Sequence, residues 1–303
     1  MKKFFKRLVY ILDSKLVWRV FFHINVVRLK LGLYVWNKKW KFKYLNSEIF
    51  SNNADSSLFI LGSGSSSEKI SGNQWEEVKS NFSIGLNLWL VHDFNPSAYA
   101  FELDKFVPDQ YFEDRARILK SKINKGFKPL IFLLPRGIKR NKLPIPNELY
   151  SSTYIYSNAP TLAHLVSFSK DAIKSSISMT SGAKTGWPAV FGDGASIERM
   201  VSIGIKNRFK NIILVGVDLN DITCFYDINK KYFEKHDFSL PDDPRKHLEV
   251  HKTMDRSIKK VTVVDTIPLM AEYAKSLGIN LYIESGSSEL AKFLPVYKWT
   301  IKE

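Results

Sequence analysis

A short apolar run at residues 58–61 breaks abruptly into glycines and hydroxyl side chains at residues 62–67. Such a run, bounded by a turn, is typical of a strand that is buried on both faces. Gly62 and Gly64 lack a Cβ atom, so the backbone there can take a positive φ and turn its N–H groups toward an anion. The stretch predicts a strand that leads into an anion-binding turn. An ordinary serine-rich strand-to-helix turn is the alternative, because only two glycines are present.

Apolar runs of the same kind alternate with helical periodicity along the rest of the chain. Strands are expected at residues 58–61, 82–87, 98–102, 129–135, 153–156, 211–218 and 280–283. Helices are expected at residues 74–80, 109–125, 161–168, 170–178, 195–205, 263–277 and 288–294. This alternation predicts an α/β fold that is Rossmann-like, with a mainly parallel sheet and helices on both faces.

Length and composition bound the domain organisation. A chain of 303 residues with one cysteine, Cys224, can form a large core but no intramolecular disulfide, which is typical of a reducing compartment. We expect residues 46–56 to be a polar linker and residues 57–303 to be the catalytic body. Residues 219–251 lack periodicity over a length that is more typical of a lid than of an idle loop.

Most of the net charge of +15 lies at the N-terminus, where residues 1–45 hold twelve lysines and arginines against one acid, Asp13. The same residues include many aromatic and aliphatic side chains, which predicts a basic amphipathic segment on an anionic membrane surface. Lys15, Arg19 and Arg28 interrupt any window long enough to span a bilayer. A helical hairpin folded onto the body and a nucleic-acid arm are the alternatives. We expect no nucleic acid, because such an arm would not require so many large apolar residues.

Polar residues follow three of the expected strands, namely Asn87, Glu102 and Asp218. Open α/β sheets bind their ligands at the carboxyl ends of the strands, so these side chains predict a site at one edge of the sheet. The segment at 219–251 adds His236, His247 and His251, which are candidate general bases near neutral pH. All three histidines could instead be solvated loop residues.

Other chemistries find less support in the sequence. The chain contains no Asp-x-Asp motif, and the pair His247 and His251 lacks the adjacent glutamate of a zinc protease helix. No Gly-x-Ser-x-Gly elbow or dinucleotide-binding fingerprint occurs at the glycine turn. We therefore expect a site that uses neither a metal ion nor a separate cofactor.

The order of these motifs resembles that of the bacterial sialyltransferases of glycosyltransferase family 42, over about residues 57–295. Residues 62–66, Gly-Ser-Gly-Ser-Ser, resemble the family's Gly-Asn-Gly-Pro-Ser turn, and residues 85–87 resemble its Cys-Asn step. Gly216-Val217-Asp218 resembles its Gly-Ile-Asp, and Ile279-Asn280-Leu281-Tyr282 its last strand. Glu102 stands where the family has an asparagine, and Asn220 where it has a tyrosine, a role that Tyr226 or Tyr232 could take.

This resemblance implies a role for each matched residue. Nucleotide-binding roles fall on Gly62, Ser63, Gly64, Ser65, Ser66 and Asn87; substrate-binding roles fall on Glu102, Asp218 and Asn220; the general base is His251 or His247. The implied activity is a glycosyltransferase that moves a sialic acid-like nonulosonic acid, or Kdo, from a CMP-activated donor to a surface-glycan or lipid-linked acceptor. Such an enzyme of lipopolysaccharide or capsule biosynthesis would lie on the cytoplasmic face of the bacterial inner membrane. The alternative is a nucleotide-binding α/β protein, pyrophosphokinase-like or regulatory, that transfers no sugar.

Overall fold

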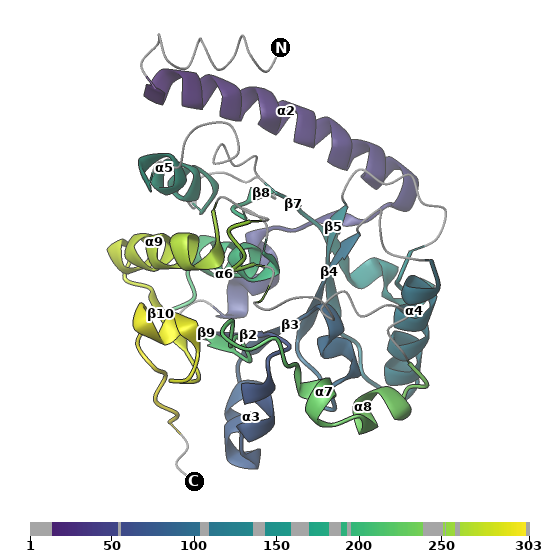
Figure 1. The fold of residues 1–303 in the computed structure, drawn as a ribbon. Helices are drawn as coiled ribbons and strands as arrows, with labels where there is room; N and C mark the ends of the chain where they lie inside the picture. Colours follow the sequence, from purple (N-terminus) through teal and green to yellow (C-terminus); the bar gives the residue numbers. More distant parts are fainter. Residues whose placement is uncertain are drawn as a thin grey trace.

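The computed structural model describes residues 14–53, 56–103, 109–135, 143–158, 170–181, 189–192, 195–238, 251, 253–257 and 261–300. Within these ranges the chain forms an eight-stranded sheet in which every pair of neighbouring strands is parallel (Figure 1). The strands are β1 (Lys43–Tyr44), β2 (Ser57–Leu61), β3 (Phe82–Leu86), β4 (Ala98–Leu103), β5 (Leu130–Pro135), β6 (Thr153–Ile155), β9 (Asn211–Val215) and β10 (Asn280–Ile283). The predicted α/β class is therefore confirmed.

The strands lie in the order β1-β6-β5-β4-β3-β2-β9-β10. The direction in which the chain adds successive strands to the sheet therefore reverses at β2. From β2 the chain steps through β3, β4, β5 and β6 toward one side of the sheet, whereas β9 and β10 lie on the other side of β2. In open α/β sheets, the carboxyl ends of the two strands that flank such a switch point are where ligands bind. The glycine turn follows one of these strands, β2, and Asp218 follows the other, β9.

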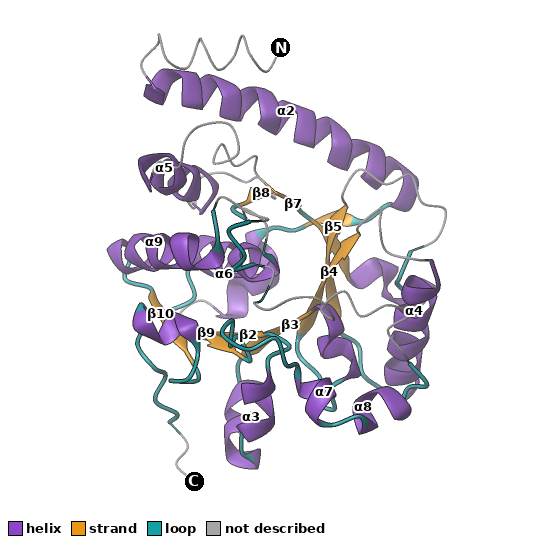
Figure 2. Ribbon diagram, in the orientation of Figure 1, coloured by secondary structure: helices purple, strands orange, loops and turns teal. Residues whose placement is uncertain are grey.

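Helices cover both faces of the sheet (Figure 2). One face carries α5 (Lys170–Ser181), α6 (Ser196–Lys206) and α9 (Val263–Ser276), and the other carries α3 (Gly72–Lys79), α4 (Asp109–Asn124), α7 (Phe225–Ile228) and α8 (Lys231–Glu234). The side chains between the sheet and α5, α6 and α9 form a first hydrophobic core, and those between the sheet and α3, α4, α7 and α8 form a second. Along β2, Leu58 and Ile60 belong to the first core, whereas Phe59 and Leu61 belong to the second. Because successive side chains of a strand point to opposite faces, a strand covered on both faces must be apolar throughout. This explains the continuous apolar run.

All seven expected strands are present, with ends that differ by up to three residues. The expected helices at 74–80, 109–125, 170–178, 195–205 and 263–277 correspond to α3, α4, α5, α6 and α9, and 288–294 contains the 3-10 helix η6 (Glu289–Lys292). Residues 161–168 lie outside the described residues. The short β1 and the separate pair β7 (Ser157–Asn158) and β8 (Ala189–Val190) were not predicted, because two-residue strands leave no periodicity to detect.

The expected linker at residues 46–56 was wrong. Residues Ser47–Asn53 form a 3-10 helix, η1, and Phe50 in it is buried against Phe82, Phe132 and Phe209. Just before it, β1 pairs with β6 at the edge of the main sheet. The folded body therefore begins before residue 46, because one aromatic side chain in a polar stretch was enough to attach it to the core.

Residues 219–238 and 251 of the expected lid are described by the structure, and they pack on the body in this conformation. Residues 225–234 form the short helices α7 and α8, and the side chains of Phe225, Tyr226, Tyr232 and Phe238 are buried in the second core. These contacts fix the segment on the body. Residues 239–250 lie outside the described residues.

The basic N-terminal segment contributes one long helix, α2 (Ser14–Trp40). Its buried Leu33 and the partly buried Trp36 and Trp40 pack against the second core, and Trp40 also contacts Phe42 and Tyr150. None of the described helices, α2 included, is both long enough and apolar enough to cross a membrane.

Candidate functional site

The glycine turn at the carboxyl end of β2 is tied to the end of β9. The backbone N–H of Gly62 donates to Val215 O (2.7 Å), and that of Gly64 donates to Gly216 O (2.7 Å). The next N–H in this series, that of Ser66, donates to Asp218 Oδ2 at 3.0 Å. The strand-like pairing of β2 with β9 thus continues into the turn.

This arrangement corrects the expected geometry of the turn. Neither Gly62 nor Gly64 has a positive φ, and their N–H groups are used within the protein instead of facing an anion. A Cβ atom on Gly62 would lie 2.5 Å from Gly216 O, and one on Gly64 would lie 2.5 Å from Asp218 Oδ2. The two glycines are needed for a close approach of the β2 and β9 ends.

Two carboxyl groups, that of the buried Asp218 and that of the half-buried Glu284, lie near each other at this edge. Asp218 follows β9 and uses its Oδ2 atom to accept from Ser66 N and from Ser65 Oγ (3.3 Å). Glu284 follows β10, and its backbone N–H donates to Leu214 O at 2.8 Å. Burial and the charge of Asp218 raise the pKa of Glu284 to about 7, against the lowering effects of Ser66, the Gly216 N–H and Lys69. Glu284 was not among the predicted site residues, although it directly follows a predicted strand.

Asn87 occupies the end of the neighbouring strand β3 and is exposed, with a φ of +51°. A positive φ is uncommon for a residue other than glycine, although asparagine tolerates it better than most. This backbone conformation allows the 3-10 helix η3 (Asn87–Val91) to begin directly at the strand end. The structure thus places the Asn87 side chain at the same edge as the glycine turn.

Glu102, near the end of β4, is paired within the protein. Its Oε1 atom accepts from Arg199 Nη2 and from Ser196 Oγ, both in α6. Burial lowers the pKa of Arg199, but the Glu102 carboxylate and further acidic groups outweigh burial and raise it overall. The predicted substrate contact of Glu102 therefore competes with an ion pair that the sequence did not reveal.

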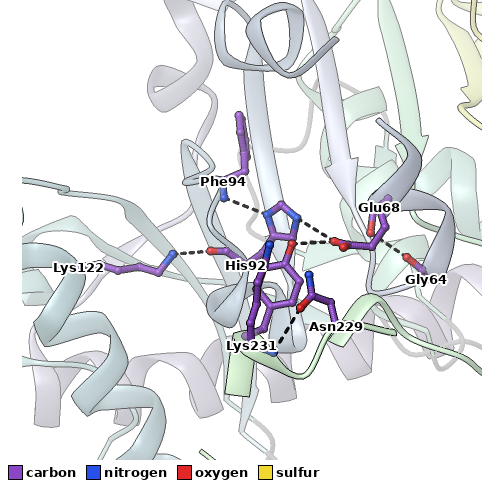
Figure 3. Close-up of polar contacts among 9 residues, drawn as sticks. Gly64, Glu68, His92, Phe94, Lys122, Asn229 and Lys231 are labelled. Carbon is purple, nitrogen blue, oxygen red and sulfur yellow. Dashed lines mark hydrogen bonds and ion pairs between the residues drawn. The ribbon is translucent and has the colours of Figure 1, made fainter. Parts of the chain in front are cut away.

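A cluster of three polar residues, Glu68, His92 and Tyr232, lies beside the glycine turn; Figure 3 shows Glu68 and His92 near Gly64. Tyr232 Oη donates to Glu68 Oε1 at 2.7 Å, and His92 Nε2 lies 3.8 Å from the same oxygen. The His92 ring is stacked between Trp89 and Tyr232, with ring centroids 4.3 and 5.1 Å away. Because Glu68 belongs to η2 (Ser65–Lys69), this cluster holds α8 against the helix that follows the glycine turn.

Burial sets the protonation of this cluster. It lowers the pKa of His92 to about 4, a shift to which Lys122 and Lys231 add and which Asp93 opposes. The neutral ring accepts from the Phe94 N–H through Nδ1, at 2.9 Å. Lys122, whose pKa burial lowers to about 8, donates to the His92 carbonyl (2.9 Å) and to Asn95 Oδ1 (2.7 Å).

The three candidate bases differ in their position relative to the carboxyl edge of the sheet. His251 lies beside the start of α9, with Nδ1 2.7 Å from Thr253 Oγ1, and Thr253 O accepts from Val263 N. Because α9 precedes the parallel strand β10, its first turn is at the carboxyl edge of the sheet. His247 lies outside the described residues. His236 follows α8, and its carbonyl accepts from Arg117 of α4.

The remaining predicted residues have partners within the body. The Asn220 amide donates to Ser287 O at 2.8 Å, which links the loops after β9 and β10. Tyr226 is buried and stacks on Phe233, and Tyr232 is engaged with Glu68, so neither phenol is presented to a ligand in this conformation. Within the described residues, no group of three or more His, Cys, Asp and Glu side chains could hold a metal ion.

No family model and no curated protein matches the sequence. Among solved structures, the chain is similar to the sialyltransferase CstII from Campylobacter jejuni in complex with CMP-3FNeuAc, with a TM-score of 0.45 and 16% identity over 79% of this chain and 86% of that chain. For the complex of the same enzyme with cytidine-5'-monophosphate, the TM-score is 0.43 at 13% identity, over 80% of this chain and 85% of that chain. At these scores the likeness transfers no residue roles and no activity to this chain.

Proposed function

We propose that this protein is a glycosyltransferase that moves a nonulosonic acid or Kdo from a CMP-activated donor to a surface-glycan or lipid-linked acceptor. The observation that carries the proposal is the polar edge at the switch point between β2 and β9. Ser65, Ser66 and Asp218 meet there, and Asn87 lies at the end of the next strand. This is the position at which an open α/β sheet binds a nucleotide.

The chemistry needs a base and a way to hold the donor. Transfer proceeds by direct displacement: the acceptor hydroxyl loses its proton to His251 or His247, and its oxygen bonds to the anomeric carbon. The bond from that carbon to the phosphate oxygen breaks, and CMP leaves. A histidine suits the first step because its pKa is near neutral. The turn at 62–66 and Asn87 bind the nucleotide. Asp218 binds hydroxyl groups of the donor or the acceptor, and Asn220 and Glu102 also contact the substrates.

A nucleotide screen followed by a transfer assay tests the proposal. Calorimetry with CMP, CDP, UDP and GDP should show a preference for CMP, and CMP-sugar turnover should rise when a glycan acceptor is added. His251→Ala should leave CMP affinity near that of the wild type and lower transfer by about 10²-fold or more, since a general base contributes that much. His236→Ala is the control, because the hydrogen bond from Arg117 of α4 goes to the main-chain carbonyl of residue 236 and is kept in this variant. Tight binding of ATP or GTP with no CMP-sugar turnover would instead establish the nucleotide-binding alternative.

Attachment to a membrane surface is the second part of the proposal. Five exposed apolar residues of α2 lie within about 100° around the helix axis, opposite the buried Leu33. They are Ile24 (56% exposed), Val27 (56%), Leu31 (62%), Tyr34 (60%) and Val35 (64%). The helix carries no acidic residue and includes Lys30, Lys38 and Lys39, so the face suits anionic lipid headgroups. Such a position, peripheral on the cytoplasmic face of the inner membrane, would hold the enzyme where lipid-linked acceptors are made.

Vesicle binding by the full chain tests this part, since removal of residues 1–45 would also remove β1 and the buried Phe42. Wild-type protein should sediment with phosphatidylglycerol vesicles and much less with phosphatidylcholine vesicles. The double variant Leu31→Ser and Val35→Ser should lose most of this binding. Ile228→Ser, which removes an equally exposed apolar residue (59%) from α7, should not change it. Unchanged binding of the double variant would reject the proposed membrane face.

A further inference from the structure

The two carboxyl groups at the ends of β9 and β10 have acceptor atoms that the protein leaves unused. Asp218 is only 6% exposed, and its Oδ1 atom is buried without a hydrogen-bond partner among the described residues. The same holds for Glu284 Oε2. A buried acceptor without a donor is destabilising, so a ligand that supplies donors at this place would be favoured.

Ser66 lies between the two carboxyl groups. Its N–H is bound to Asp218 Oδ2, while its Oγ atom faces Glu284 and is itself buried without a well-aligned partner. The side chain of Ser66 is 3% exposed. Three unsatisfied oxygen atoms from three adjacent strand ends, β2, β9 and β10, therefore gather at one point of the edge.

Charge decides which ligand groups can enter. Asp218 and Glu284 would repel a phosphate or a sugar carboxylate, and the N–H groups of Gly62, Gly64 and Ser66 are already used. A vicinal diol has the required properties, because it is neutral and offers two O–H donors to carboxylate oxygens. In a nucleotide the vicinal diol is that of the ribose.

We propose that Glu284 accepts the 2′-hydroxyl group and Asp218 the 3′-hydroxyl group of the ribose of the donor nucleotide, so that Glu284 is a specificity residue for ribonucleotides. This inference rests on the proposed nucleotide-dependent function and names the part of the nucleotide that each strand end binds. It assigns a role to Glu284, which no motif of the sequence indicated.

The pair also makes ribose binding depend on pH. The groups that face Glu284 are Asp218 from β9, Ser66 and Lys69 from η2, and the Gly216 N–H. A hydroxyl donor is held best by the ionised carboxylate, so binding favours the deprotonated form of Glu284. Because the pKa of Glu284 in the free protein is about 7, the preference for ribose should rise between pH 6 and pH 8.

Calorimetry of the full chain with CMP and with 2′-deoxy-CMP tests this inference. We expect CMP to bind at least about 10-fold more tightly at pH 8, since a hydrogen bond to a charged group is lost with the 2′-hydroxyl. The ratio of the two affinities should fall toward pH 6. The phosphate titrates near pH 6 in both nucleotides and so cancels in the ratio. In Glu284→Gln the ratio should be smaller and independent of pH, whereas Glu76→Gln on the exposed side of α3 should retain it.

The outcomes separate this inference from the proposed function. If CMP does not bind the wild type, the proposed function fails. If CMP binds but the wild-type ratio is near one at every pH, or Glu284→Gln leaves it unchanged, the ribose assignment is overturned and the proposed function stands. Loss of Mn²⁺ binding in Glu284→Gln with an unchanged ratio would also overturn it, in favour of a cation site. The wild-type ratio against pH remains decisive if Glu284→Gln does not fold.

Discussion

Gly64 lies where the backbone leaves no room for a Cβ atom, because the atoms of Gly216 and Asp218 occupy that space. The nearest contact would be with the Asp218 carboxylate at 2.5 Å, and the next with the Gly216 carbonyl at 2.7 Å. Neither neighbour is the free end of a flexible side chain, because Asp218 is held by Ser65 and Ser66. The constraint at this residue is therefore steric.

Gly64→Ala should lower the free energy of unfolding by about 1–3 kcal/mol, because a methyl group there forces the β2 and β9 ends apart. Gly72→Ala at the start of α3 is the matched control, since a Cβ atom there meets nothing within 4 Å. That variant should be neutral or slightly stabilising. Urea unfolding of both variants and the wild type measures the difference, and equal stabilities would contradict the close approach.

Protonation of His92 should make the free energy of unfolding fall at low pH. Its pKa is about 4 in the folded protein and 6.5 when unfolded, so the unfolded chain binds more protons between these values. The contribution of neutral His92 is fully present above pH 6.5 and is lost as the pH falls toward 4, by on the order of 3 kcal/mol. Unfolding free energies of the wild type and His92→Gln, measured from pH 7 to pH 4, should converge; parallel curves would refute the prediction.

At the scale of elements, the segment α7–α8 is attached to the body mainly through side chains. The buried rings of Phe225 and Tyr232 pack against the ring of His92, and Tyr232 Oη donates to Glu68 of η2. Because η2 directly follows the glycine turn, a movement of α8 would shift the edge of the site. The structure thus couples this segment to the turn.

Tyr232→Phe keeps the ring but removes the hydroxyl donor to the Glu68 carboxylate. We expect amide hydrogen exchange in residues 225–238 to become roughly 10-fold faster, because a hydrogen bond to a charged group contributes about 1.5–3 kcal/mol. Tyr273→Phe, in α9 on the opposite face, should leave exchange in this segment unchanged. Equal exchange in both variants would mean that the aromatic packing alone holds α7–α8.

At the scale of the whole molecule, the ion pair of Glu102 and Arg199 joins the β4 side of the sheet to α6. Arg199 is 1% exposed, so its charge depends on a partner that lies 97 residues earlier in the chain. A buried charge that loses its partner is costly, whereas replacement of a whole buried pair by apolar residues is often neutral.

Glu102→Ala should therefore destabilise the protein by about 3–5 kcal/mol, and the double variant Glu102→Ala and Arg199→Met should recover much of that loss. A double-mutant cycle from thermal or urea unfolding measures the coupling. Additive effects of the two single variants would show that the pair does not stabilise the fold. Unchanged KM values for the CMP-sugar and for the acceptor in the double variant would in addition remove Glu102 from the proposed substrate contacts.

The sequence by itself determined the α/β class, the seven longer strands and most of the helices, because strands buried on both faces leave continuous apolar runs and amphipathic helices leave a clear period. It also placed Asn87 and Asp218 at strand ends. Only the tertiary structure decided the direction of the Gly62 and Gly64 N–H groups, the partner of Glu102, the buried position of His92 and the meeting of Glu284 with Asp218. These depend on contacts between segments that are far apart in the chain, such as β2 with β9 and β4 with α6, and local periodicity carries no information about which segments will pair.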